Sequence, residues 1–472
     1  MKFLKSLTDR RSNLLFLLMF GVITLLNVNY AVLRSARNAL AVADLGGGAG
    51  SIPWFELCGT MPGAVLMTFA LTWLLNRYPI HKVFFTVLWT FMGFFLFFAL
   101  GIYPLLPACK GAIASLEWLP AREMISSFVP LFASMIFFVM AELWKIALLT
   151  ILFWGLVNQY VPVESAKRFY APLILGGSIG TIAAGPLISF CTSDLLVDSW
   201  SASLSLLMGA LTLISLITAW LFALLWRLLS AQDPVTAAPP VEEEKKEPLS
   251  IWESLRICFK SPYLMLLAWV TIADYVAYAL GEIVFLDVLK QKFPDPRAYC
   301  DFMGRLSFWN GTLTAFSALV ITPYLLRRCR WVVASLVTPV CLLVTEGVFF
   351  FILWHPAYSK ELELLVISGS LFFCLVRAAK YTLFDTSKEI SFILLPPLEK
   401  MQGKLVVDGM CARLGRGSGS FLSLALIQIC GGVLATAPIA GTLALLIAGS
   451  CVLATKRLGA LVDDKTPKTK PA

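Results

Sequence analysis

The sequence has few charged residues and almost no histidine. Only 14% of its 472 residues are charged, whereas a soluble globular domain has about 25%. His81 and His355 are its two histidines, and its 11 cysteines include no Cys-x-x-Cys pair. These shortages exclude a cytosolic enzyme, a secreted disulfide scaffold and a disordered chain. They also predict no metal site and no cofactor.

Apolar and aromatic residues make up 58% of the chain and gather in runs long enough to cross a bilayer. One spanning helix needs about 20 residues. The runs fall at residues 13–33, 52–75, 83–106, 126–160, 169–192, 202–227, 261–290, 302–326, 331–354, 364–392, 402–429 and 432–455. We therefore predict an all-α integral membrane protein with about twelve transmembrane helices.

Residues 231–250 interrupt this pattern with AQDPVTAAPPVEEEKKEPLS, whose prolines and charges are typical of a linker. We expect an N-terminal six-helix half (1–230), a cytoplasmic linker (231–250) and a C-terminal six-helix half with a basic cytoplasmic tail (251–472). The segments Leu71–Phe85 and Ile321–Ser335 echo each other, since each joins two spans through a basic loop. Together these features suggest parallel repeats of the major-facilitator type, with a substrate site between the halves near the bilayer midplane.

The net charge of +9 reflects topology. Lysine and arginine gather in Met1–Arg11, in alternate loops and in the tail from Lys456 to Lys470, which predicts that both termini are cytoplasmic. The surplus is therefore no sign of a nucleic-acid partner. Met1–Arg11 leads directly into the first span, without a cleavage site or a transit segment, which favours a multi-pass protein of a bacterial inner membrane.

Several charged residues lie inside the predicted spans, where each costs at least about 2.5 kcal/mol to insert and so needs a reason. Arg34 and Arg37 share one helical face with Asn27 and Tyr30 in the first span. The two arginines either line a cavity or reach water at the outer end of the span.

The second, fourth and seventh spans also carry acids. Glu56 lies near the outer end of its span, where a carboxylate also reaches water. Glu142 and Lys145 lie one turn apart in the middle of a long apolar stretch, so they either neutralise each other or serve a site, and their depth favours a site. Asp274 and Glu282 share a face, which makes them candidates for proton binding or for pairing with basic residues of the other half.

The tenth and eleventh spans are rich in cations. Arg377 and Lys380 lie one turn apart, and Arg416 stands in the run LGRGSGS (Leu414–Ser420). The run is no Walker loop, and its glycines either allow close helix packing or expose backbone N–H groups to a phosphate. Cations outnumber acids among the deep charges. Because arginine forks suit phosphates, the residues indicate a transporter of an anionic, phosphorylated solute.

Six stretches carry a resemblance to a known family. They read NYAVLRSARNALAV (29–42), IPWFELCGTMPGAV (52–65), VMAELWKIALLTILFWGLVNQYVPVESAKRFY (139–170), LKQKFPDPRAYCDFMG (289–304), AAKYTLFDTSKE (378–389) and GKLVVDGMCARLGRGSG (403–419). They resemble the nucleotide transporter family, the ATP/ADP translocases of plastids and obligate intracellular bacteria. The resemblance implies a twelve-helix, major-facilitator-like carrier that moves nucleotides by alternating access and is not an enzyme.

The family's ATP/ADP exchangers have four charged positions associated with transport. By resemblance, the fourth-span glutamate is Glu142 and the seventh-span glutamate is Glu282. The lysine of the eleventh-span glycine motif corresponds to Arg416, which keeps the charge. The second-span lysine corresponds to Glu56, so the charge is reversed there, which makes import with a proton or a less charged substrate plausible.

We predict a carrier of ATP, ADP or related nucleotides that works by exchange or by proton-coupled import. The resemblance implies phosphate binding by the basic residues Arg34, Arg37 and Lys380, and Lys145 joins the predicted site as the partner of Glu142. Two alternatives stay open. One is a proton-coupled transporter of another anionic metabolite such as NAD, and the other is a polytopic membrane enzyme. Such an enzyme needs a cluster of carboxylates or histidines in a loop, and this sequence has no such cluster. The expected partners are a nucleotide, the lipid bilayer and protons as a candidate coupling ion, with the chain acting as a monomer.

Overall fold

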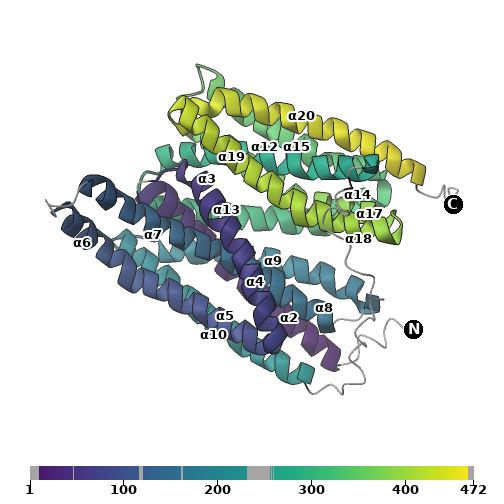
Figure 1. Ribbon diagram of the computed structural model, residues 1–472, viewed down its shortest axis with the longest axis horizontal. Helices are drawn as coiled ribbons and strands as arrows, with labels where there is room; N and C mark the ends of the chain where they lie inside the picture. The colour runs from purple at the N-terminus through teal and green to yellow at the C-terminus, as the bar shows by residue number, and fades with distance from the viewer. Residues whose placement is uncertain are drawn as a thin grey trace. The chain divides into compact units, whose positions relative to one another are not determined.

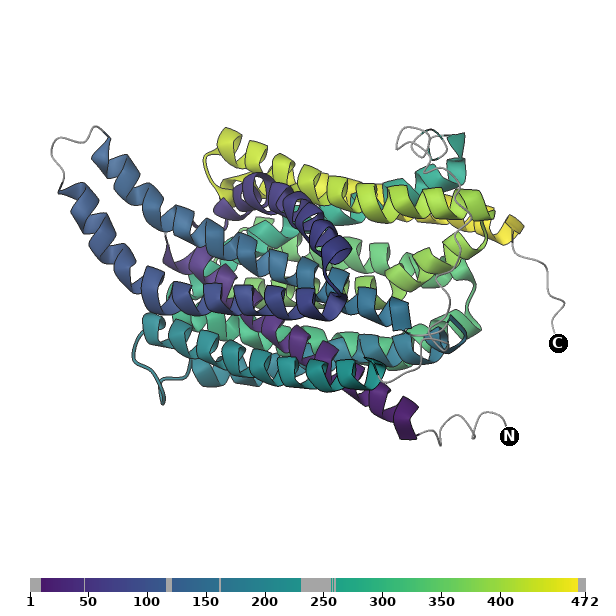
Figure 2. The same ribbon diagram turned by 60° about the horizontal axis from the view of Figure 1, so that its bottom comes forward.

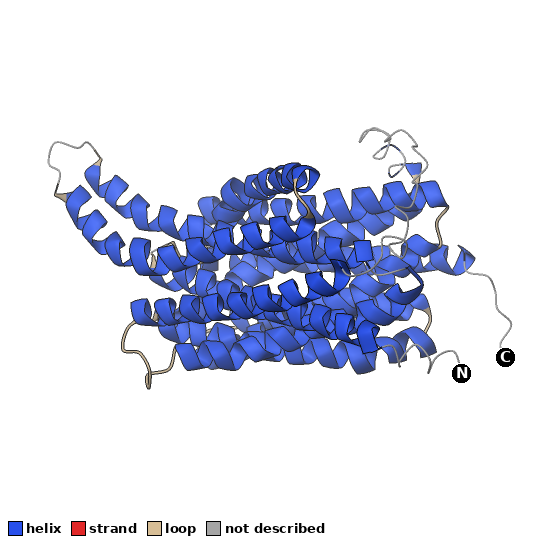
Figure 3. Cartoon of the chain, turned by 90° about the horizontal axis from the view of Figure 1, so that it is seen from below, coloured by secondary structure: helices blue, strands red, loops and turns tan. Residues whose placement is uncertain are grey.

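The computed structural model describes residues 10–45, 47–115, 121–160, 163–230, 256, 258 and 260–465. Most of these residues are helical and none of them forms a strand (Figure 3). The predicted runs all fall in helices, to within about two residues at their ends. Ten helices of the described part are long and apolar enough to cross a membrane, and the runs at 302–326 and 402–429 are helical but more polar. The all-α prediction is therefore confirmed.

The chain forms two compact units. Unit 1 comprises Met1–Gly48, Cys58–Glu242 and Phe293–Thr312, and unit 2 comprises Ala49–Leu57, Glu243–Lys292 and Leu313–Ala472. The predicted division into halves at 1–230 and 251–472 stays a prediction. The predicted linker at 231–250 lies outside the described residues.

Unit 1 is built around α2, which is drawn in purple in Figure 1. Its helices are α2 (Arg10–Asn38), η1 (Ala39–Asp44), α4 (Met61–Arg77), α5 (Ile80–Phe97), η3 (Phe98–Ile102), α6 (Tyr103–Ala114), α7 (Arg122–Trp144), η4 (Lys145–Phe153), α8 (Trp154–Tyr160), α9 (Val163–Cys191), α10 (Trp200–Ser230) and most of α13 (Pro296–Phe316), where η marks a π-helix. Helix η2 (Glu56–Thr60) crosses the boundary between the units. Helices α6 and α7 run side by side (blue in Figure 2).

Small residues and aromatic rings hold unit 1 together. Helix α2 packs against α9 and α10. A Cβ at Gly180 of α9 would lie 2.2 Å from the backbone oxygen of Thr24, so glycine is what permits this approach of the two helices. Between α5 and α10, the rings of Phe84 and Phe222 stack with centroids 3.7 Å apart. Between α5 and α7, the ring of Phe95 contacts that of Phe137.

Unit 2 is organised around α12 (Pro262–Lys292), which packs against α20 and α19 (Figure 1). Helix α12 also packs against α16. The other helices of unit 2 are α3 (Ser51–Phe55), η5 (Ser317–Ile321), α14 (Thr322–Arg328), α15 (Trp331–Trp354), α16 (Leu362–Ala379), η6 (Lys380–Phe384), α17 (Asp385–Ile393), α18 (Pro397–Lys404), η7 (Leu405–Cys411), α19 (Ala412–Cys430) and α20 (Val433–Lys465).

The glycines of LGRGSGS pack α19 against α12. A Cβ at Gly415 would lie 3.0 Å from the Cβ of Tyr275, and one at Gly419 would lie 2.9 Å from the Cβ of Ala279. Glycines spaced by four residues form a flat stripe on which a second helix lies closely. Of the two interpretations of this run, close helix packing is the one that these contacts support.

Candidate functional site

A buried ion pair joins α2 to α7 in unit 1. The Arg37 guanidinium donates to Oε1 of Glu142, and both side chains are less than one-tenth exposed. The Tyr30 hydroxyl donates to the same oxygen at 3.1 Å. The guanidinium carbon of Arg37 also lies 4.2 Å from the ring centroid of Phe138, which adds a cation–π contact. A desolvated pair needs such additional partners, because its Coulomb attraction alone does not offset the cost of burial.

Two further cations flank this pair. Lys145 Nζ lies 5.1 Å from the ring centroid of Tyr30, and Arg34 is half-buried one turn before Arg37 on α2. We call Tyr30, Arg34, Arg37, Glu142 and Lys145 the unit 1 cluster. With three cations and one carboxylate, this cluster has a net positive charge and is complementary to an anion.

In unit 2, two acids of α12 bind cations from the neighbouring α16 and η6. Glu282 Oε1 lies 2.8 Å from Nη2 of Arg377, and Asp274 Oδ2 lies 3.4 Å from Nζ of Lys380. The side chain of Asp274 is 2% exposed and that of Lys380 is 14% exposed. The acids therefore pair with cations of their own unit. Proton binding by these acids, or pairing with basic residues of the other half, stays a prediction.

Tyrosines of α12 contact the same cations. Nζ of Lys380 lies 3.2 Å from the ring centroid of Tyr275, and the guanidinium carbon of Arg416 lies 5.4 Å from that centroid. The Tyr278 hydroxyl accepts from Nε of Arg377 at 2.5 Å. Lys380 and Arg416 come from different helices, and both lie near the aromatic ring of Tyr275.

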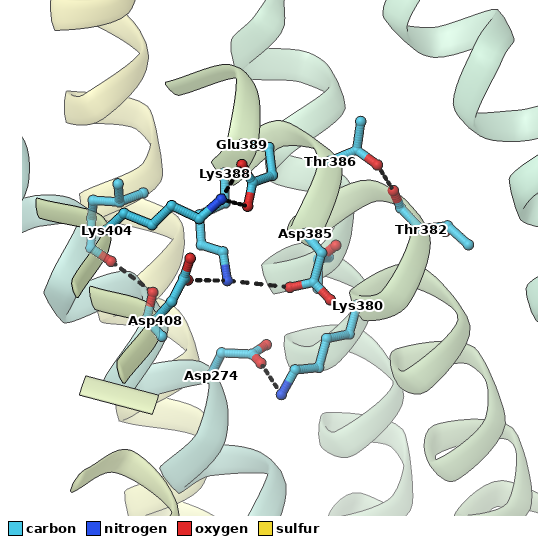
Figure 4. Close-up of polar contacts among 12 residues, drawn as sticks. Asp274, Lys380, Thr382, Asp385, Thr386, Lys388, Glu389, Lys404 and Asp408 are labelled. Carbon is cyan, nitrogen blue, oxygen red and sulfur yellow. Dashed lines mark hydrogen bonds and ion pairs between the residues drawn. The ribbon is translucent and has the colours of Figure 1, made fainter. Parts of the chain in front are cut away.

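A second network ties α17 to η7 (Figure 4). Nζ of Lys388 lies 2.7 Å from Oδ1 of Asp408 and 3.4 Å from Oδ1 of Asp385, and Figure 4 shows it between the two carboxylates. Nearby, Nζ of Lys404 lies 2.7 Å from Glu389, and both side chains are about half exposed. The half-buried Lys388–Asp408 pair joins α17 to η7, whereas an exposed pair such as Lys404–Glu389 contributes little to stability.

Glu56 meets the glycine motif within unit 2. The Ser420 hydroxyl donates to Oε2 of Glu56, and helix α3 packs against α19. Ser420 lies one turn after Arg416 on α19. The two positions at which this chain differs from the family's lysines therefore belong to neighbouring segments.

Three residues of the predicted site begin a π-helix: Glu56 begins η2, Lys145 begins η4 and Lys380 begins η6. A π segment inserts an extra residue into a turn, re-aims the side chains that follow, and occurs frequently at functional sites. Among the described residues, no group of three His, Cys, Asp or Glu side chains is placed to hold a metal ion.

A family model for the TLC ATP/ADP transporter matches residues 10–461. The chain belongs to this family. ADP,ATP carrier protein 1 of Chlamydia trachomatis is 31% identical over 443 residues, which cover 89% of this chain and 83% of that relative. The chloroplastic ADP,ATP carrier protein 1 of Arabidopsis thaliana is 30% identical over 448 residues, with 91% and 71% covered. A solved structure of a nucleoside transporter NupG variant has a TM-score of 0.55 at 16% identity and covers 95% of this chain and 99% of its own.

Membership of the TLC ATP/ADP transporter family makes this chain a multi-pass membrane transporter and not an enzyme. The structural likeness shows a major-facilitator-like fold, and the resemblance found in the sequence motifs is confirmed.

Within each unit, the structure brings some of the predicted site residues of this TLC transporter together. Arg34, Arg37, Glu142 and Lys145 form the unit 1 cluster. In unit 2, Lys380 and Arg416 share the ring of Tyr275, while Glu282 and Glu56 bind other partners. Their roles in transport stay predictions.

Sequence reasoning missed Tyr275 and Glu346. Tyr275 directly follows Asp274 on α12 and so lies off the face that Asp274 shares with Glu282. Its contacts with Lys380 and Arg416 join three different helices, which spacing within α12 does not predict. Glu346 carried a clear signal: it is the one acid in the apolar run from Trp331 to Trp354.

Proposed function

We propose that this chain exchanges ATP for ADP, or closely related nucleotides, across a membrane by alternating access. The observation that carries the proposal is the pairing of buried cations with carboxylates inside spanning helices, Arg37 with Glu142 and Lys380 with Asp274. The relatives named ADP,ATP carriers support the choice of nucleotide.

A buried ion pair suits a carrier because its cation has a partner when no substrate is bound. A phosphate group offers the Arg37 fork two oxygens in the plane that guanidinium prefers, and more negative charge than one carboxylate. Nucleotide binding then displaces Glu142 from Arg37. The displaced carboxylate needs another cation, and this need links occupancy of the site to the conformation of the carrier.

In unit 2 the same reasoning applies to Lys380, whose ammonium is shared between Asp274 and the ring of Tyr275. We assign phosphate binding to Arg34, Arg37, Lys380 and Arg416. Glu142 and Glu282 act as the carboxylates that hold cations in the empty carrier and release them when nucleotide binds.

Glu56 supports a substrate preference that differs from that of relatives with lysine at this position. Its carboxylate accepts from Ser420, one turn from Arg416, so it lowers the positive potential near one of the proposed phosphate ligands.

We further propose that the carrier works as a monomer in a bacterial inner membrane, with both termini in the cytoplasm and no nucleic-acid partner. The distribution of lysine and arginine among the loops supports this orientation. A reporter enzyme that is active only in the periplasm, fused to either terminus, tests this orientation. If both termini are cytoplasmic, neither fusion should show reporter activity.

Uptake of labelled ATP into proteoliposomes tests the function. Vesicles loaded with ADP should take up ATP faster than empty vesicles, and unlabelled ATP and ADP should compete better than GTP, UTP, CTP or NAD. Failure of every nucleotide to enter would overturn the proposal.

A matched pair of variants tests the site. Arg37→Met removes the buried cation, and Lys404→Met removes a cation from an exposed ion pair. Because a charge-assisted hydrogen bond contributes about 1.5–3 kcal/mol, R37M should weaken ATP binding roughly tenfold or more. K404M should bind ATP as the wild type does, and equal effects of the two variants would contradict the assignment.

A further inference from the structure

Glu346 of α15 is an acid buried in the membrane-spanning part of unit 2, and no described residue forms a hydrogen bond with its carboxyl. Its exposure is 0%, and within the described part of the chain neither carboxyl oxygen has a hydrogen-bond partner. It lies roughly two turns before the end of α15. Buried carboxylates are otherwise paired or hydrogen-bonded, so this one needs a specific explanation.

Apolar groups surround the carboxyl. Leu342, one turn earlier, belongs to an apolar cluster of α12, α15, α16 and α20. One turn later, the ring of Phe349 meets that of Phe285 edge-on, with centroids 6.2 Å apart. A Cβ at Gly281 of the facing α12 would lie 2.4 Å from Oε1 of Glu346, so glycine leaves the room that the carboxyl occupies. None of these groups donates a hydrogen bond to a carboxylate.

The nearest charges do not neutralise Glu346. Asp274 lies two turns before Gly281 on the same face of α12, about 10 Å along the helix, and it already holds Lys380 at 3.4 Å. Glu282, next to Gly281, holds Arg377 at 2.8 Å. The other described titratable or charged groups on helices packed against α15 are Tyr263, Tyr275, Tyr278, Asp287, Lys290 and Lys292 of α12, Tyr324, Arg327 and Arg328 of α14, Glu363 and Cys374 of α16, Tyr381 of η6, Asp385, Lys388 and Glu389 of α17, and Cys451, Lys456, Arg457 and Asp463 of α20.

We propose that Glu346 is protonated in this conformation and is the residue at which the carrier binds and releases a proton during nucleotide transport. A proton from water adds to one carboxylate oxygen and gives the neutral acid, which costs far less to bury than the ion. When alternating access brings Glu346 to water or to a cation, the ionised form is favoured and the proton returns to water. One proton therefore crosses with the nucleotide. The proposal rests on the nucleotide transport proposed above.

Proton movement in proteoliposomes tests this role. Wild-type carrier should admit protons together with ATP into vesicles that hold no nucleotide, as a pH-sensitive dye in the lumen reports, and an acidic exterior should accelerate ATP uptake. Glu346→Gln keeps the shape of the neutral acid but carries no proton. This variant should exchange external ATP for internal ADP at a rate within about twofold of the wild-type rate. Its proton influx, and the increase in its ATP uptake caused by an acidic exterior, should each be at least tenfold smaller than in the wild type.

Two further variants make the test decisive. Glu363→Gln removes a carboxylate whose side chain is 79% exposed and should leave proton influx unchanged. Glu346→Met fills the same volume without polar atoms, so it replaces E346Q if the amide is not tolerated, and the same loss is expected. Infrared spectra supply a readout that is independent of transport: the carbonyl band of a protonated acid should be present in the wild type and in E363Q, and absent from E346Q.

Lack of this band in the wild type would overturn the proposal, as would proton influx that persists in E346Q and E346M. Loss of exchange together with proton influx in folded E346Q and E346M would also overturn it, since Glu346 would then serve transport as a whole. Exchange by the wild type, with no proton influx accompanying ATP into vesicles that hold no nucleotide, would overturn the proton role alone. Absence of all nucleotide transport by the wild type would overturn the proposed function and the proton role with it.

Discussion

Removing one member of the Arg37–Glu142 pair should destabilise the carrier much more than removing both. The two side chains are less than one-tenth exposed, and α2 and α7 hold them in contact. A single substitution to methionine leaves one uncompensated charge in a medium of low dielectric constant, whereas the double substitution leaves none.

The contacts indicate the size of each effect. Breaking a buried pair from one side costs about 3–5 kcal/mol. Arg37→Met leaves Glu142 with the Tyr30 hydroxyl as a donor at 3.1 Å, so we expect a cost near the lower end, about 3 kcal/mol. Glu142→Met leaves both Arg37 and the Tyr30 hydroxyl without this acceptor, so we expect about 5 kcal/mol. The double variant should lie within about 2 kcal/mol of the wild type, because apolar residues of similar volume replace a desolvated pair at little cost.

Equilibrium unfolding of the four proteins in detergent gives the coupling energy directly. The costs above imply a coupling of at least about 6 kcal/mol for this pair. We expect less than about 1 kcal/mol for the same cycle at the exposed Lys404–Glu389 pair. Effects of Arg37→Met and Glu142→Met that add to within about 0.5 kcal/mol would refute the reasoning, because independent residues behave in that way.

Three other substitutions separate packing from binding. Gly415→Ala places a Cβ 3.0 Å from the Cβ of Tyr275 and should lower the free energy of unfolding, measured by thermal unfolding, by about 1–3 kcal/mol. Gly409→Ala is the control, because a Cβ there would meet nothing within 4 Å, and an equal loss of stability in both variants would contradict the packing argument. Glu56→Lys should raise the preference for ATP/ADP exchange over other nucleotides in competition assays, since it restores a cation, and unchanged selectivity would argue against a substrate role. Lys380→Met should raise the KM for ATP roughly tenfold; an unaltered KM would exclude it as a phosphate ligand.

The helices and their membrane character follow from local sequence. A spanning segment must satisfy its own backbone hydrogen bonds and expose apolar side chains to lipid. A run of about 20 apolar residues meets both requirements by itself, so it can be recognised from local sequence. For the same reason, helical spacing correctly placed Asp274 and Glu282 on one face of α12, where cations of the adjacent helix meet them. The motifs around Glu142 and the glycines of α19 also indicate the family by themselves.

The partners of those charges arise from contacts between segments that are distant in the chain. Glu142 accepts from Arg37, 105 residues earlier, and Ser420 donates to Glu56, 364 residues earlier. Spacing within one helix cannot select a partner on another helix, because that choice depends on helix rotation, on small residues that permit approach, and on π turns such as the one that begins at Lys380. Glu346 illustrates most clearly the difference between what local sequence shows and what packing between helices determines. The sequence shows an acid in an apolar run, but the lack of a hydrogen-bond partner for it among the described residues follows from how α12, α15, α16 and α20 pack around it.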